Sequence, residues 1–183
     1  MSILLALLLQ AAPAAAPKSP TIDQLVELRR VVSVALSPDA SQAAYVVREA
    51  NWEENAFETE IWLADAAGGV PRRLTNAKKS SDAPAFSPDG RRLAFASDRS
   101  DKRQIYLIDP RGGEAEVLTS AEEGVQGFAW SKDGRAIAYL AQDPKSEALK
   151  EREKKGGEYE VVGQDRRMSH LHVIDVASKK ARR

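Results

Sequence analysis

The sequence predicts an all-β protein, a partial β-propeller of about two and a half four-stranded antiparallel blades. Three markers recur in the same order along the chain. A Ser-x-Asp-Gly/Ala turn begins at Ser37, Ser87 and Ser131, with spacings of 50 and 44 residues. Leu-Thr pairs repeat at positions 74 and 118, and Ile-aromatic-Leu triplets repeat at positions 61 and 105. Periods of about 40–50 residues, each with several short strands, are typical of propeller blades.

An apolar run, residues 3–9, opens the chain and is followed by small residues. Ala12 and Ala14 occupy the −3 and −1 positions of a signal-peptidase site, so the pattern predicts a signal peptide over residues 1–14. The run is far shorter than the roughly 20 residues that span a bilayer. We therefore expect an exported protein, periplasmic or secreted, with no membrane attachment after cleavage. The alternative is an apolar N-terminal tail or a misassigned start codon.

A short helix is predicted within residues 15–30, ahead of the first strand. Thr21 and Gln24 have the spacing of a capping box, in which each side chain bonds to the other residue's backbone N–H. Leu25 and Leu28 continue an apolar stripe along the same helix face.

The repeats divide the rest of the chain, residues 31–183, into an incomplete propeller with blades at about 31–75, 79–119 and 124–183. The middle unit shows the pattern most clearly. In its Ser-Pro-Asp-Gly turn, Asp89 can bond to the local backbone and Gly90 can adopt the left-handed conformation of a tight hairpin.

The strand that follows this turn has an apolar side chain on both faces. Leu93 and Phe95 share one face, while Ala94 and Ala96 share the other. The polar stretch 97–103, the strand "QIYLID", the turn "PRGGE" and the strand "AEVLT" complete the unit. Two apolar faces predict a blade that is covered by a neighbour on each side.

The first and third units depart from this pattern. The first has a polar stretch at residues 48–60, which predicts a long loop between its second and third strands. The third has a charged insertion at about 143–167. Its segment "KSEALKEREKKGG" predicts a solvated helix with a Glu151–Lys155 pair, ended by Gly156-Gly157, and "EYEVV" predicts an extra strand.

The third unit is expected to lack its fourth strand. Arg182-Arg183 aligns with Arg72-Arg73, after which a Leu-Thr pair should follow, but the sequence stops. Propellers close with four to eight blades, so we expect an N-terminal fragment of a longer protein. Uncovered blade faces and an open edge predict that the fragment alone forms homo-oligomers or aggregates.

Composition excludes several classes of function. Lys plus Arg and Asp plus Glu each total 27, so the chain lacks the net positive charge of a nucleic-acid binder. No cysteine is present, which excludes disulfides and thiolate metal sites. Asp39, Asp89 and Asp133 repeat at one turn position and are interpreted as turn formers rather than calcium ligands or acid–base groups. His170 and His172 lie on one face of a strand, and a strand pair that faces solvent or a neighbouring blade is favoured over a catalytic base or metal pair. We expect no catalytic residue, cofactor or metal in this chain.

The repeat "FSPDGRRLAFASDRSDKRQIYLIDPRGGEAEVLT" resembles the propeller of prolyl oligopeptidase family serine peptidases, in particular the bacterial acylaminoacyl-peptidase and dipeptidyl-peptidase branch. "REANWEENAFETEIWLAD" and the Lys/Glu-rich insertion followed by "LHVID" add to the resemblance.

The resemblance implies a C-terminal α/β-hydrolase domain with a Ser-Asp-His triad, to which the propeller restricts the access of short peptides. The Gly-x-Ser-x-Gly motif, which carries the nucleophilic serine of α/β-hydrolases, does not occur in the chain. The peptide substrate would therefore bind to the C-terminal hydrolase domain and not to this chain. The alternative is a TolB-like periplasmic propeller that binds proteins.

Overall fold

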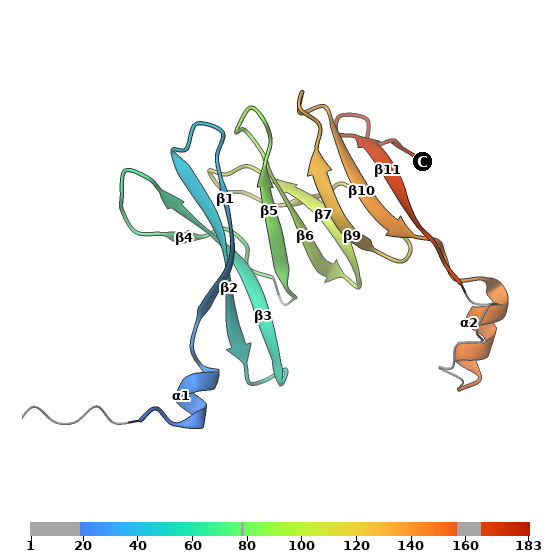
Figure 1. The fold of residues 1–183 in the computed structure, drawn as a ribbon, viewed down its shortest axis with the longest axis horizontal. Helices are drawn as coiled ribbons and strands as arrows, with labels where there is room; N and C mark the ends of the chain where they lie inside the picture. The colour runs from blue at the N-terminus through green and yellow to red at the C-terminus, as the bar shows by residue number, and fades with distance from the viewer. Residues whose placement is uncertain (1–18, 78, 157–165) are drawn as a thin grey trace, which may run out of the picture.

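The computed structural model describes residues 19–77, 79–156 and 166–183, which form three antiparallel sheets standing side by side in chain order (Figure 1). We call these four-stranded sheets blades 1, 2 and 3. Blade 1 contains β1 (Arg30–Leu36), β2 (Gln42–Asn51), β3 (Ala56–Asp65) and β4 (Arg72–Arg73). Blade 2 contains β5 (Ser81–Phe86), β6 (Leu93–Ser100), β7 (Lys102–Ile108) and β8 (Glu116–Val117). Blade 3 contains β9 (Val125–Trp130), β10 (Ala136–Gln142), β11 (Ser169–Asp175) and β12 (Ala181–Arg182).

The predicted all-β propeller class is confirmed, and the third blade is more complete than expected. Its fourth strand, β12, pairs with β11 through Ala181 opposite Ile174 and Arg182 opposite Val173. The fourth strand of every blade is only two residues long, and the Leu-Thr marker follows that strand rather than forming it. The expectation that the third unit ends before its fourth strand, with an open edge along β11, is therefore wrong.

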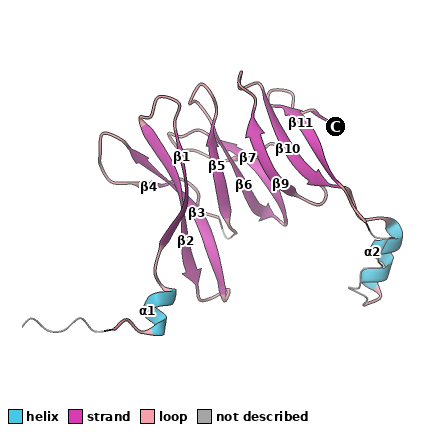
Figure 2. Cartoon of the chain, in the orientation of Figure 1, coloured by secondary structure: helices cyan, strands magenta, loops and turns pink. Residues whose placement is uncertain are grey.

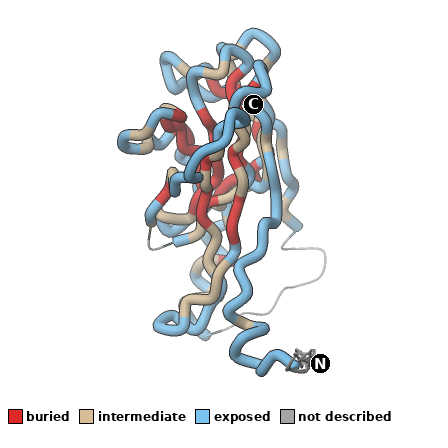
Figure 3. Tube along the Cα trace, turned by 90° about the vertical axis from the view of Figure 1, so that its left-hand side faces the viewer, coloured by how far each residue is buried: buried red, intermediate tan, exposed pale blue. Residues whose placement is uncertain are grey.

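Blade 2 is covered on both faces, as its sequence predicts. We call the face toward the preceding blade the leading face and the face toward the following blade the trailing face. The leading face of blade 2 places Leu93, Phe95, Tyr106 and Ile108 against Ala44, Val46, Ile61 and Leu63 of blade 1. Its trailing face places Ala94, Ile105, Leu107 and Leu118 against Val125, Ile137, Tyr139, Ala141 and Ile174 of blade 3. Figure 3 shows the buried positions gathered along these inner strands.

The two blade interfaces repeat one arrangement, a flat ring pair against aliphatic side chains. Phe95 and Tyr106 stack with ring centroids 5.7 Å apart on the leading face of blade 2. Tyr139 and His172 stack at 5.2 Å at the equivalent positions of blade 3. Ring pairs of this kind add roughly 0.5–1.5 kcal/mol beyond the burial of their area. The leading face is thus aromatic and the trailing face aliphatic in both interfaces.

The three Ser-x-Asp turns are built alike. In the middle turn Ser87 Oγ donates to Asp89 Oδ1 at 2.6 Å, and the Arg91 N–H donates to the same oxygen at 3.1 Å. The hydroxyl of Ser37 and the N–H and hydroxyl of Ser41 lower the pKa of Asp39 to about 2. The aspartates therefore close the turns, as the sequence predicts.

In blades 1 and 2, a buried group of hydrogen bonds, which we call the clasp, fastens the segment after the fourth strand to the third strand. In blade 1 the carboxylate of Glu60, which is 1 % exposed, accepts from the Thr75 hydroxyl and from the Ala77 N–H at 3.1 Å. Thr75 Oγ1 in turn accepts from the Ile61 N–H at 2.9 Å. Blade 2 makes the same bonds with Gln104, Thr119, Ala121 and Ile105.

Two stretches predicted as turns are largely strand. Residues 48–60, expected to be a loop, continue β2 and β3 in unbroken register to the pair Asn51–Ala56. The turn itself is closed by Asn51, whose side chain accepts from the N–H groups of Glu53 and Glu54. Residues 97–103 likewise extend β6 and β7 to the pair Ser100–Lys102 through a bulge. Neither hairpin was predicted from the sequence, because the strand extensions reach beyond the apolar core and carry polar side chains there.

Both predicted helices are present, and Figure 2 shows them against the strands. α1 (Ile22–Val26) begins with the predicted Thr21–Gln24 capping box. α2 (Glu147–Lys154) is capped by Ser146, and its Glu151 pairs with Lys154 at 2.9 Å rather than with Lys155. Within the described residues, neither helix has the length and apolar character needed to cross a membrane. The predicted signal peptide, Gly157 and the predicted strand "EYEVV" lie outside the described residues.

The turn glycine yields a first prediction. Gly90→Val should lower the free energy of unfolding by on the order of 1 kcal/mol or more, because φ is +70° there. Ala40 holds the same position at φ 55° and already carries a Cβ, so Ala40→Val should cost less. Ala40→Gly is the matched control and should not destabilise the protein, because it releases left-handed strain. Chemical denaturation measures all three, and equal losses for the two valine variants would contradict the prediction.

The clasp yields a second prediction. Thr75→Val should lower the free energy of unfolding by about 1–3 kcal/mol, because it leaves the buried Ile61 N–H without its acceptor and removes one hydrogen-bond donor from the Glu60 carboxylate. Thr75→Ser keeps the hydroxyl and should lose much less. Urea unfolding of both variants measures this difference. A serine variant as unstable as the valine variant would contradict the prediction, because serine keeps the hydroxyl that makes both bonds.

The turn aspartates yield a third prediction, on acid stability. The folded-state pKa of Asp39 is about 2, below the unfolded value of about 3.9, so its contribution is present above pH 4 and is lost as the pH falls toward 2. Asp39→Asn removes the charge, so the melting temperatures of wild type and variant should differ at pH 7 and converge between pH 4 and pH 2. Asp101→Asn, at a different hairpin tip, is the control. A difference that stays constant down to pH 2 would contradict the assignment.

Candidate functional site

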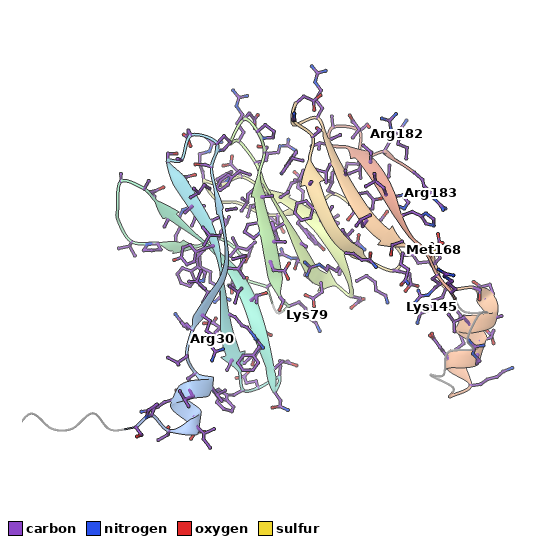
Figure 4. All side chains as sticks on the ribbon, in the orientation of Figure 1. Arg30, Lys79, Lys145, Met168, Arg182 and Arg183 are labelled. Carbon is purple, nitrogen blue, oxygen red and sulfur yellow. The ribbon has the colours of Figure 1, made fainter. Side chains whose placement is uncertain are left out.

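The two histidines do not form a pair, because they contact different neighbours. His172 stacks on Tyr139 within blade 3. His170 Nε2 lies 3.0 Å from Asp143 Oδ2, and a guanidinium nitrogen of Arg183 lies 2.8 Å from His170 Nδ1. Figure 4 shows Arg183 on the outer side of blade 3. Hydrogen bonding by His170 and its charge lower the pKa of Asp143.

This Asp143–His170–Arg183 cluster contains an acid and a base, but no nucleophile is bonded to them. Among the described residues, no serine or threonine hydroxyl hydrogen-bonds to either histidine ring. His170 also occupies the position that Glu60 and Gln104 hold in the clasps of blades 1 and 2. The cluster is therefore best described as a polar contact at the end of blade 3.

The repeated aspartates remain apart at the ends of their own blades. Asp39, Asp89 and Asp133 each accept from the serine two residues earlier. Within residues 19–77, 79–156 and 166–183, no group of three His, Cys, Asp or Glu side chains is arranged to hold a metal ion. These aspartates therefore act one by one within the turns.

A cleft of about 520 Å³ opens between blades 2 and 3 at the end that carries these turns. Trp130 forms part of its wall and donates from Nε1 to the carbonyl oxygen of Ala85 at 3.0 Å, which ties blade 3 to blade 2. The remaining polar lining carries charges of both signs, from Arg91, Arg92, Arg135, Asp89 and Asp175. This mixture lacks the single-sign field of a nucleic-acid groove.

The opposite end of the propeller carries an exposed apolar patch. In Figure 1 α1, the closed end of the β2–β3 hairpin and α2 all lie at this end. α1 and the hairpin enclose a depression of about 330 Å³ whose apolar walls include Leu25, Leu28 and Phe57. The Arg48 guanidinium lies 4.2 Å above the Phe57 ring. We call this surface the α1 patch; its Leu25, Leu28 and Phe57 are 46 %, 53 % and 49 % exposed.

The outermost sheet faces are apolar and uncovered. On the trailing face of blade 3, Leu140 and Leu171 lie opposite each other and are 43 % and 59 % exposed. On the leading face of blade 1, Val34 is paired with Tyr45, which in turn is paired with Trp62. The equivalent faces of blade 2 are covered by its neighbouring blades.

These surfaces and the clasp were not predicted from the sequence, for different reasons. The Leu-Thr markers were visible as repeats, but their hydroxyl partners, Glu60 and Gln104, are different residue types 15 positions earlier. The α1 patch is formed by side chains from a helix and from a hairpin that was predicted as a loop. A repeat alignment that compared positions 60, 104 and 170 could have indicated the clasp.

Comparisons with known proteins agree with this architecture. Residues 24–171 match the family described as TolB beta propeller domain. The chain is 37 % identical over 79 residues to the uncharacterised peptidase YuxL of Bacillus subtilis, which covers 43 % of this chain and 12 % of that protein. It is 48 % identical over 42 residues to a TolB homologue of Chlorobium chlorochromatii, which covers 23 % of this chain and 10 % of that protein.

The fold recurs in a solved peptidase. The Pyrococcus horikoshii acylaminoacyl peptidase superposes with a TM-score of 0.67 at 20 % identity, over 87 % of this chain and 25 % of that chain. The predicted resemblance to peptidase propellers is thereby confirmed, and the chain spans about an eighth of the length of YuxL. Since the family match extends over most of the chain, the protein belongs to the TolB beta propeller domain family.

Proposed function

We propose that this chain is the propeller portion of an exported serine peptidase, in which the propeller restricts a C-terminal α/β-hydrolase domain to short peptides. The likeness to YuxL and to an acylaminoacyl peptidase supports a peptidase parent. The predicted signal peptide at residues 1–14 supports export. Any catalytic triad would belong to the hydrolase domain.

The observation that carries the proposal is the placement of the α1 patch at one end of the blades. A propeller that covers a catalytic domain needs one end fitted to that domain. The end with the tight turns is polar, whereas the α1 patch exposes Ile22, Leu25 and Phe57 beside the cations Arg30 and Arg48. An apolar surface with a charged rim is suited to protein docking. In this proposal the hydrolase domain contacts the α1 patch.

A second candidate function is a TolB-like module that binds other proteins. The family match and the 48 % identity with a TolB homologue favour it. The two proposals differ in the protein encoded by the complete gene. A peptidase should carry a Gly-x-Ser-x-Gly elbow after further blades and react with a fluorophosphonate probe, and a TolB-like module should do neither.

The fourth prediction tests the proposed gating in the protein encoded by the complete gene. Leu25→Asp combined with Phe57→Asp should loosen the docking of the two domains, so cleavage of a long unfolded polypeptide should rise about tenfold relative to a chromogenic dipeptide. Val70→Asp, at a site that is 95 % exposed, is the control and should leave this ratio unchanged. The 183-residue chain alone should hydrolyse neither substrate.

Each result bears on a separate part of the proposal. Absence of probe labelling would reject the peptidase and favour the TolB-like module. Labelling with an unchanged cleavage ratio would reject the gating role of the α1 patch. Turnover by the 183-residue chain that is lost in His170→Ala would show that a site in this chain had been overlooked.

A further inference from the structure

The cleft between blades 2 and 3, which we call the second cleft, has an equivalent between blades 1 and 2, the first cleft. The first cleft, of about 460 Å³, is lined in part by Gln42 and Arg111. The second cleft, of about 520 Å³, has Arg92 and Ala177 at the equivalent positions of the repeat. These two exchanges between repeats decide how much unpaired charge each cleft holds.

In the first cleft both side chains are engaged by an aspartate of their own blade. Arg111 binds Asp109 through two nitrogens, with Nε 3.0 Å from Oδ1 and a terminal nitrogen 2.6 Å from Oδ2. These bonds and the charge of Arg111 lower the pKa of Asp109 to about 2. Gln42 Nε2 donates to Asp65 Oδ1 at 2.8 Å. Neither position therefore has a free donor group directed to a ligand.

Arg92 of the second cleft has no such partner. Arg92 precedes β6 and Asp109 follows β7, and the first residue of β6 pairs with the last residue of β7. The carboxylate of Asp109 is nevertheless bound by Arg111. In the part of the chain that the structure describes, nothing forms a hydrogen bond or an ion pair with the Arg92 guanidinium. An exposed and unpaired cation therefore lines the second cleft.

The acidic side chains that line the second cleft are held by their own turns. Asp89 accepts from the Ser87 hydroxyl at 2.6 Å. Asp175 accepts from the Ser178 N–H at 2.8 Å and from its hydroxyl at 2.7 Å. Three arginines and two aspartates line the second cleft, which gives it a formal net charge of +1. The charge available to a ligand is therefore positive.

The rest of the second cleft offers an apolar wall. Trp130, Val176 and Ala177 all contribute to the lining. The indole N–H of Trp130 is already used, because it donates to the carbonyl oxygen of Ala85 at 3.0 Å. The Trp130 ring and its apolar neighbours can therefore contact an aliphatic or aromatic group of a ligand, but they add no donor.

We propose that the second cleft binds the carboxylate of a peptide, with the Arg92 guanidinium on the carboxylate and the Trp130 wall against the adjacent apolar side chain. The planar fork of arginine matches a carboxylate with two parallel hydrogen bonds. A monoanion is favoured over a phosphate dianion, because two aspartates share the lining and the net charge is only +1.

The proposed site is independent of the proposed peptidase function. It lies at the end of the blades that carries the tight turns, opposite to the α1 patch, and blades 2 and 3 supply both of its walls. The carboxylate of a peptide C-terminus and that of an acidic side chain share this chemistry, so the experiment has to separate these two sources.

The fifth prediction is carboxylate-dependent peptide binding by the protein encoded by the complete gene. Any reactive serine is first blocked with a fluorophosphonate, and calorimetry then measures three peptides. Acetyl-Leu-Leu carries a free C-terminus, acetyl-Leu-Glu-amide carries only a side-chain carboxylate, and acetyl-Leu-Leu-amide carries neither. At least one of the two carboxylate peptides should bind about tenfold or more tightly than the neutral amide. The tighter of the two identifies the source of the carboxylate.

A substitution taken from the repeat itself locates the binding. Arg92→Gln should weaken binding of the carboxylate peptide about tenfold or more, with little change in melting temperature, because blade 1 carries Gln42 at this position. Lys132→Gln removes the same charge from the turn of blade 3 outside the cleft lining and should leave the affinity unchanged.

Several outcomes would overturn the proposal. They are no binding of either carboxylate peptide at millimolar concentration, equal binding of the neutral amide, and unchanged affinity in Arg92→Gln. An equal loss in Lys132→Gln would show a general effect of surface charge instead of a site. Inorganic phosphate that binds more tightly than the carboxylate peptides would assign the cleft to a different ligand.

Discussion

The structure depends on one constraint, that each blade is a thin sheet with two apolar faces and only its neighbours can cover them. Blade 2 meets this requirement within the chain, since Phe95 and Ala94, which are adjacent in sequence, are both fully buried in opposite interfaces. Full burial of each large side chain in these interfaces contributes roughly 1.5–3 kcal/mol, which a single isolated sheet could not gain. Stability therefore resides mainly between the blades rather than within them.

The difference between the faces gives the stack a direction. Ring pairs such as Phe95–Tyr106 lie on leading faces, and smaller aliphatic side chains such as Val46 and Ile61 lie on trailing faces. Planar rings fill the space above small side chains, so a like pair of faces would leave voids or clashes. The same asymmetry limits what can cover the outer faces, because only a surface of the opposite kind continues the packing.

The two ends of the blades serve different purposes. At one end the Ser-x-Asp turns recur almost unchanged, since Asp39, Asp89 and Asp133 each bond to a nearby serine and backbone N–H. At the other end α1, the β2–β3 hairpin and α2 vary from blade to blade (Figure 1). Variable segments on a rigid frame are where function is usually found in repeat folds, which is why the proposed docking surface lies there.

The sequence by itself determined the repeat, the propeller class, the turn chemistry and the two-sided burial of blade 2, because each follows from local spacing and from alternation along one strand. Only the tertiary structure decided the rest. The Glu60–Thr75 clasp joins residues 15 positions apart, and the α1 patch joins a helix to a distant hairpin. β12 was missed because two residues carry no periodicity, and it forms only because β11 offers a partner. Hydrogen bonds and contacts between residues far apart in the sequence leave no local pattern, so only the folded structure shows them.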